Sequence, residues 1–386
     1  RQVPDGLCVP QDRIVDITEH LDGRGRLQWA VPEGTWTILR MGHTSTGHRN
    51  TTGGGGVGLE CDKFNPEAVR LQYDRWFAEA VRQIGPDLAG RVLKVLHVDS
   101  WEAGSQNWSP VFREEFRRRR GYDLLPCLPA MAGIPIGSAE GSERFLQDVR
   151  ETIGELVTDR FFGTLADLAH RQGCTFSAEN VAPTMTCDGM RHFGVVDVPM
   201  GEFWLRSPTH DKPNDMLDAI SGGHVYGRPI VQAEAFTELQ FPWDEHPALI
   251  KALGDRQLAL GINRFVMHVF VHNPWLDRRP GMTLGPTGLF FQRDQTWWRP
   301  GRAWVDYLRR CQVLLQTGRP VADVAVFTGE GMPRRAVLPD QLVSTLPGVI
   351  GPEALQREAG RMANEGQPLR ALPKAVTASA HIRDLA

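Results

Sequence analysis

Three glutamates stand out because each follows a strand-like run and has an aromatic residue within two positions. Glu102 lies in "DSWEAG", Glu202 in "MGEFW" and Glu234 in "QAEAF". A carboxyl group beside an aromatic wall loses hydration, which raises its pKa and lets it hold a proton near neutral pH. A carboxylate in a polar setting stays ionised and can activate water. One of each, on opposite sides of a sugar ring, could hydrolyse a glycosidic bond.

The stretch "HVDSWEAGSQNW", residues 97–108, admits two interpretations. It is either a polar turn whose hydrogen bonds are satisfied internally or the floor of a site that grips a hydroxylated ligand. A single glutamate at a strand end is more often a structural hydrogen-bond acceptor than a catalyst. Three of them, in a mouth that also carries tryptophan and histidine, favour the site. We therefore predict Glu102, Glu202 and Glu234 as its catalytic carboxylates.

Further polar and aromatic residues near strand ends are predicted to bind the substrate. They are His43, Asp99, Trp101, Asn180, Trp204, His268 and His272. The two histidines of "HVFVH" have the four-residue spacing of zinc-binding helices, but Val-Phe-Val favours a strand and the glutamate of HExxH is absent. Positions four apart on a strand share a face, so we expect both histidines to point into the mouth and bond the substrate.

Other chemistries find little support. The four consecutive glycines near residue 54 lack the GK[ST] ending of a phosphate-binding loop. The sequence has no GxSxG elbow, and none of its six cysteines sits in a zinc or nucleophile signature. With 43 basic and 46 acidic residues, a net charge of −3, nothing indicates a nucleic-acid surface. No apolar run is long enough for a membrane span.

The elements that would position these residues alternate between short apolar runs and longer amphipathic ones. Strand-like runs occupy 36–43, 58–61, 94–100, 174–180, 194–203, 229–236, 263–271 and 322–327, and helical patterns lie between most of them. This alternation predicts an α/β fold, a (β/α)8 barrel of the TIM type, with an open doubly wound sheet as the alternative. Barrel active sites lie at the carboxyl ends of the strands, where the predicted site residues are placed.

Three segments are predicted along the chain. Residues 1–35 would be the end of a preceding β-rich domain or linker, and "LQWAVPEGTWTIL" (27–39) predicts a short β-hairpin. Residues 36–330 would form the catalytic barrel. Residues 331–386, rich in proline and glycine, would begin an incomplete C-terminal extension, so we expect the chain to be part of a longer protein.

Several of these motifs together resemble the α-L-rhamnosidases of glycoside hydrolase family 106. They are "TSTGHRN", "GLECDK", "HVDSWEAGSQNW", "FRRRRGYDLLPCLPAMAG", "MGEFW", "VQAEAF" and "QTGRPVADVAVFTGE", spread over residues 13–380. The resemblance implies a (β/α)8 barrel that removes terminal α-L-rhamnose from plant polysaccharides or rhamnosides. It further implies inversion at the anomeric carbon, calcium dependence, and a periplasmic or secreted bacterial protein.

Matching by motif, the resemblance implies that Glu102 is the general acid, Glu234 the general base and Glu202 a third essential acid of the pocket. Asp99 matches the aspartate that precedes the acid. Which of Glu102 and Glu234 is acid and which is base stays open. An inverting pair should lie about 6.5–9.5 Å apart to admit a water molecule. The implied calcium has Asp99, Glu179 and Asn180 as possible ligands, and the sequence does not choose among them.

Two other functions remain as alternatives. The barrel could bind carbohydrate without turning it over, or it could be a glycosidase for another sugar. Members of the family are also much longer than this chain, with β-rich domains on both sides of the barrel.

Overall fold

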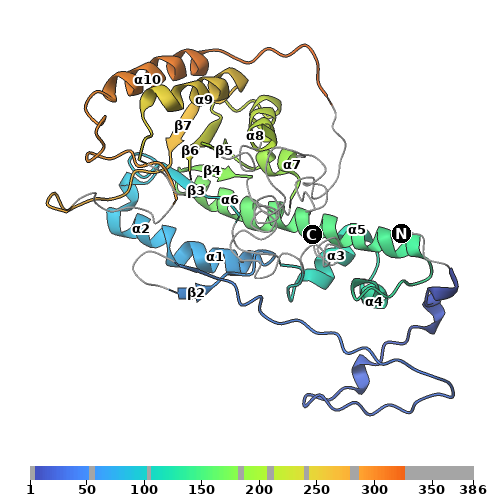
Figure 1. The fold of residues 1–386 in the computed structure, drawn as a ribbon. Helices are drawn as coiled ribbons and strands as arrows, with labels where there is room; N and C mark the ends of the chain where they lie inside the picture. The colour runs from blue at the N-terminus through green and yellow to red at the C-terminus, as the bar shows by residue number, and fades with distance from the viewer. Residues whose placement is uncertain are drawn as a thin grey trace.

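A five-stranded parallel sheet is the centre of the fold (Figure 1). The computed structural model describes residues 5–51, 57–101, 106–180, 187–206, 213–238, 243–278 and 287–326. The strands are β3 (Val95–Val98), β4 (Thr175–Glu179), β5 (Val198–Trp204), β6 (Gln232–Thr237) and β7 (Arg264–Met267), and they pair in that order. Sequential order with parallel pairing requires a crossover between each pair, and helices supply these crossovers.

The two faces of the sheet differ in character. Strand register places His97, Ser177, Gln232 and other polar residues on one face, and the side chains of Ser177 and Gln232 bond across it at 2.7 Å. The opposite face carries fully buried apolar residues. They are Leu96, Phe176, Ala178, Phe203, Ala233 and Ala235. The strict alternation of a strand therefore separates a polar concave face from a packed core.

Helices precede each strand of the sheet, and some of them pack on its apolar face. Those before β4 are α1 (Pro66–Arg75), α2 (Phe77–Ile84), α3 (Phe112–Arg120), α4 (Leu128–Met131), α5 (Ala139–Leu156), a π-helical turn (Val157–Phe162) and α6 (Gly163–Arg171). Those after it are α7 (Gly189–Gly194), α8 (Pro213–Val225), α9 (Pro247–Leu260) and α10 (Arg302–Thr317). Of these, α6 packs on β3 and β4, α8 on β5, and α9 on β6 (Figure 1).

Local signals explain where several helices begin and end. The side chain of Asn65 caps α1, Ser138 caps α5 and Asp188 caps α7, each accepting from a backbone N–H of the first turn. Helix α3 ends at Gly121, which has φ +83°, a conformation that glycine adopts at little cost.

The N-terminal part is largely irregular. Residues 5–48 contain three short 3-10 turns (Asp5–Leu7, Gln11–Arg13 and Thr18–His20) and run as an extended, exposed segment (Figure 1). The backbone of Val9 bonds Pro135 and Gly137, which ties this segment to the loop after α4. A small antiparallel pair, β1 (Arg49–Thr51) and β2 (Val57–Leu59), follows it.

The structure corrects part of the predicted barrel. The parallel strands form a curled half-barrel of five strands, and a closed eight-stranded barrel is not formed by the described residues. The runs 36–43 and 322–326 are not strands, and 27–39 is not a hairpin. A strand-like sequence becomes a strand only when a partner supplies its hydrogen bonds. In the described ranges, 36–43 and 322–326 have no partner strand, and 27–39 pairs only at its start, through an isolated bridge from Leu27 to Leu21. Residues 331–386 lie outside those ranges.

Candidate active site

Glu234 lies in β6 on the polar face, three residues before the strand ends at Thr237. Thr237 donates its hydroxyl to Glu234 Oε1 at 2.7 Å, and His268 Nδ1 lies 3.2 Å from the same oxygen. Thr237 Oγ1 and His268 Nδ1 are 2.9 Å apart. Because the hydroxyl proton goes to the carboxylate, the imidazole must donate from Nδ1 to the hydroxyl oxygen. Thr237 thus donates to the carboxylate and accepts from the imidazole, with His268 Nδ1 close to both oxygens.

A β-bulge at the end of β6 makes this contact geometrically feasible. Residues three apart on a regular strand face opposite sides, so Thr237 would point away from Glu234. The pairing register shifts here, with Phe203 opposite Ala235 but Trp204 opposite Thr237, and the intervening Phe236 has φ +67°. The extra residue returns Thr237 to the polar face. Phe236 itself is fully buried in the core.

Glu202 lies beside Glu234. The two residues are paired in register on neighbouring strands, so their side chains emerge on the same face. The indole N–H of Trp204 donates to Glu202 Oε1, and Trp204 is itself buried. The tryptophan predicted to bind substrate therefore holds one of the predicted catalytic carboxylates.

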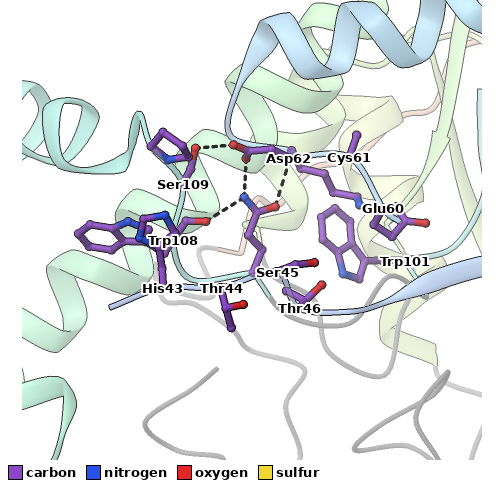
Figure 2. Close-up of a pocket in the computed structure, with 13 residues that line it drawn as sticks. His43, Thr44, Ser45, Thr46, Glu60, Cys61, Asp62, Trp101, Trp108 and Ser109 are labelled. Atoms are coloured by element: carbon purple, nitrogen blue, oxygen red, sulfur yellow. Dashed lines mark hydrogen bonds and ion pairs between the residues drawn. The ribbon is translucent and has the colours of Figure 1, made fainter. Parts of the chain in front are cut away.

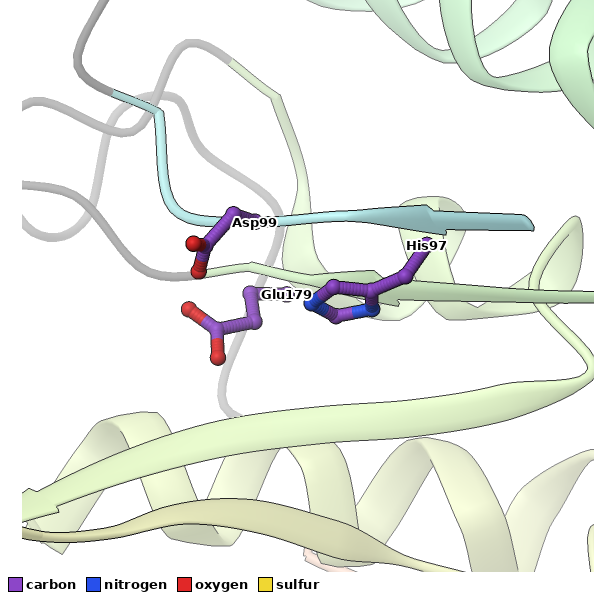
Figure 3. Close-up of side chains that lie close together, drawn as sticks. All are labelled: His97, Asp99 and Glu179. Atoms are coloured by element: carbon purple, nitrogen blue, oxygen red, sulfur yellow. The ribbon is translucent and has the colours of Figure 1, made fainter. Parts of the chain in front are cut away.

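A second cluster lies at the carboxyl ends of β3 and β4. Figure 3 shows the carboxylates of Asp99 and Glu179 close together, with the imidazole of His97 beside them. One ligand atom of each lies within 4.8 Å of the others, and Glu179 is only 2% exposed. His97 Nδ1 also lies 3.2 Å from Ser177 Oγ. Within the described ranges this is the group of acids and histidines that could hold a metal ion.

The charge of Asp99, in the second cluster, acts on His268, which lies beside Glu234. Burial lowers the pKa of His268, and the charge of Asp99 opposes that shift. The pKa of His97 is lowered by burial in the same way, again against Asp99. Asp99 follows the first strand of the sheet and His268 the last, so the curl of the sheet brings its two edges toward one mouth. Both imidazoles are held toward the neutral form.

His43 and Trp101 line a cavity of about 450 Å³ beside the end of β3 (Figure 2). The ring of His43 packs near Trp108, with centroids 6.1 Å apart. Trp101 packs on Phe161 of the π-helical turn at 6.0 Å. The buried Lys63 ammonium lies 5.2 Å from the Trp101 ring and pairs with Glu60 at 2.6 Å.

Residues 60–63 also hold the two residues that flank segment 102–105. Lys63 contacts Trp101 on one side, and its backbone N–H donates to Gln106 Oε1 at 3.1 Å on the other. The Asp62 carboxylate accepts from the Gln106 amide and, at 2.6 Å, from the Ser109 hydroxyl (Figure 2). Glu102, the remaining predicted catalytic residue, lies outside the described residues.

Two predicted substrate-binding residues lie differently from expectation. Strand β7 ends at Met267, so His272 is an exposed loop residue and does not share a strand face with His268. Asn180 is 2% exposed, and a Cβ on Gly189 would lie 2.5 Å from its amide nitrogen, so it is packed against the start of α7.

Sequence reasoning missed Thr237, His97 and Lys63. A polar residue inside the apolar run "KVLHVDS" was a usable signal for His97. Thr237 carried none, because a period-two pattern places it on the wrong face.

Comparison with known proteins gives the family. The profile of glycoside hydrolase family 106, described as alpha-L-rhamnosidase, matches residues 2–351. The chain belongs to this family. The resemblance drawn from the sequence motifs is thereby confirmed.

Two relatives show the extent of the likeness to family 106 proteins. The solved structure of a rhamnosidase from Novosphingobium sp. PP1Y is 35% identical, with a TM-score of 0.73 over 83% of this chain and 32% of that one. A protein of Formosa agariphila named "Putative beta-glucuronidase" is 42% identical over 87% of this chain. This chain spans 28% of that relative's length. Among the described helices, none combines the length and apolarity that crossing a bilayer requires.

Proposed function

We propose that this chain is the catalytic part of an inverting glycoside hydrolase that removes terminal α-L-rhamnose from rhamnose-containing oligosaccharides or glycosides. The observation that carries the proposal is Glu234 in β6, which is in register with Glu202, accepts the hydroxyl proton of Thr237 and lies 3.2 Å from His268 Nδ1. Membership of family 106 and the structural likeness to a rhamnosidase support rhamnose as the sugar that is removed.

In this proposal Glu234 is the general base. A hydrogen bond donated to a carboxylate stabilises its ionised form, and Thr237 donates one to Oε1 here. An ionised carboxylate beside a neutral imidazole can take a proton from the water that attacks the anomeric carbon. Glu102 protonates the leaving oxygen from the opposite side, and Glu202, oriented by Trp204, bonds the sugar hydroxyls.

Turnover of an aryl α-L-rhamnoside tests the proposed pair of general acid and general base, Glu102 and Glu234. Glu102→Gln should keep measurable hydrolysis of substrates with good leaving groups and lose it for poor ones, because only poor leaving groups need protonation. Proton NMR of the first product should show the β-anomer, as inversion demands. Retention of configuration would rule out this mechanism.

A calcium ion, which the family implies, is proposed at the second cluster. Asp99 and Glu179 offer the carboxylate oxygens that calcium prefers, whereas the imidazole of His97 is a poorer ligand for it. The two carboxylates would hold the ion, and the ion would supply charge to orient vicinal hydroxyls of the sugar. Chelation should abolish activity and calcium should restore it. Calorimetry with calcium alone should show binding that Asp99→Asn weakens.

A β-glucuronidase is the second candidate, favoured by the name of the 42% identical relative. A panel of aryl α-L-rhamnoside, β-D-glucuronide and β-D-galactoside distinguishes the two. If the enzyme prefers the glucuronide, a β-D-glucuronide replaces the α-L-rhamnoside as its proposed substrate.

A further inference from the structure

The cavity beside β3 shares a chain segment with the candidate active site. Asp99 belongs to the cluster proposed to bind calcium, and Trp101, two residues later, lines the cavity. A volume of about 450 Å³ lies within the range of small-ligand sites, roughly 300–1,000 Å³. A ligand that extends from the mouth of the sheet past β3 would enter this space.

The lining combines aromatic rings with hydroxyl groups. Figure 2 shows Trp101 on one side, Trp108 with His43 on the other, and Thr44, Ser45 and Thr46 between them. The hydroxyls of Ser45 and Thr46 accept from the backbone N–H groups of Gly47 and His48, at 3.1 and 3.3 Å. Each hydroxyl can therefore still donate its proton. Aromatic faces with nearby hydroxyl donors suit a ligand that has an apolar ring face and a polar edge.

The charged side chains that line the cavity already have partners within the protein. Lys63 is 5% exposed, and its ammonium pairs with Glu60 at 2.6 Å. Asp62 accepts from Ser109, from Gln106 and from the backbone N–H of Phe64. The charged side chains in the lining are thus two carboxylates and one ammonium. An anionic ligand would meet net negative charge and would find its one candidate cation already paired.

We propose that this cavity is a second sugar-binding subsite, which takes a neutral sugar residue and excludes a uronate. The inference deepens the proposed function, on which it rests only for the statement that this sugar is the leaving-group side of the substrate. Trp108 provides the apolar platform, and Thr46 donates to a ring hydroxyl.

Equilibrium binding to the whole protein tests the subsite. Calorimetric titration would use the methyl glycosides of glucose and galactose, with methyl glucuronide and methyl galacturonide as their anionic counterparts. At least one neutral glycoside should bind, and its uronate counterpart should bind at least fivefold more weakly. Trp108→Ala should weaken the neutral ligand by about tenfold, the effect of losing an aromatic contact.

Two further variants keep the test decisive. Thr46→Val is isosteric, so it removes the hydroxyl without disturbing the contact between Trp108 and Phe112, and should weaken binding severalfold. Trp76→Ala removes a 62% exposed tryptophan outside the cavity and should leave affinity unchanged. The proposal is overturned if no neutral glycoside binds, if a uronate binds equally well, or if both cavity variants bind like the wild type. The test measures binding and not hydrolysis. A failure to hydrolyse rhamnosides would therefore refute the proposed function but not the sugar-binding subsite.

Discussion

A single hydroxyl connects the base candidate to its histidine. Thr237 donates to Glu234 and accepts from His268, so it fixes both the carboxylate and the imidazole tautomer. Neutral His268 suits this role because its Nδ1–H is directed at the hydroxyl. Activity should therefore depend on a residue that has no direct role in proton transfer to the substrate.

Thr237→Val is the first prediction. It keeps the shape of the side chain but removes a hydrogen bond to a charged group, worth about 1.5–3 kcal/mol. The value of kcat/KM for an aryl rhamnoside should fall about 10- to 100-fold. Thr317→Val, at an exposed hydroxyl of α10 that bonds only backbone, is the matched control and should be neutral. Equal losses in the two variants would argue against a local role for Thr237.

At the scale of elements, the segment after β2 holds the loop after β3. Lys63 contacts both Trp101 and Gln106, which stand on either side of segment 102–105 in the chain, and Asp62 accepts from the Gln106 amide. The carboxylate of Asp62 also bonds Ser109, just before α3. A displacement of residues 60–63 would therefore move Trp101 and Gln106, the two described residues that flank segment 102–105 in the chain.

Asp62→Ala should impair general-acid catalysis more than it impairs binding. We expect kcat for a rhamnoside with a poor leaving group to fall about tenfold or more, with a smaller effect on a good leaving group. A Brønsted plot over a series of aryl rhamnosides measures this. Asp16→Ala removes an equivalent short bond to a backbone N–H at an exposed turn and serves as the control. A uniform loss across leaving groups would contradict the positioning role.

The sequence predicted which segments form the parallel strands, but the residues that the structure describes do not form the closed eight-stranded barrel that it also predicted. Five of the eight strand-like runs are the five parallel strands, because each has an apolar face that helices cover. The runs at 36–43 and 322–326 are also apolar, but they have no partner strand among the residues that the structure describes. Pairing is a property of the assembled chain, so composition alone could not distinguish the two groups.

For the site as well, the sequence predicted the positions of some residues and not of others. Asp99, Glu202, Glu234 and His268 could be placed at one edge because parallel strands end together. Thr237 could not, because the bulge at Phe236 depends on packing in the core. His272 was misplaced because β7 is shorter than its apolar run suggests.

At the scale of the molecule, one carboxyl group makes stability depend on pH. Glu238 directly follows Thr237 and is 4% exposed, with Arg206 at 3.5 Å and the buried Glu245 nearby. Burial raises its pKa to about 7, against the opposing charge of Arg206 and with the help of Glu245. The folded state therefore binds more protons here than the unfolded chain, whose value is 4.5. Its contribution is complete below pH 4.5 and is lost as pH rises toward 7.

Glu238→Gln should remove this dependence. Relative to the wild type, the variant should gain roughly 1–3 kcal/mol in free energy of unfolding between pH 5 and pH 8. Denaturant titrations at both pH values measure the difference. Glu140→Gln changes an exposed carboxylate and should show no such gain. A variant that loses stability on going to pH 8 would show that the Arg206 pair outweighs burial.

The central claim is that Glu234 acts as the base at the mouth of the half-barrel. The most direct test is the turnover number of Glu234→Gln on an aryl α-L-rhamnoside, in a protein whose melting temperature matches the wild type. General-base catalysis contributes about 10²–10⁴-fold, so we predict a loss of at least a hundredfold that a better leaving group does not restore. Turnover within a few-fold of the wild type would contradict the account.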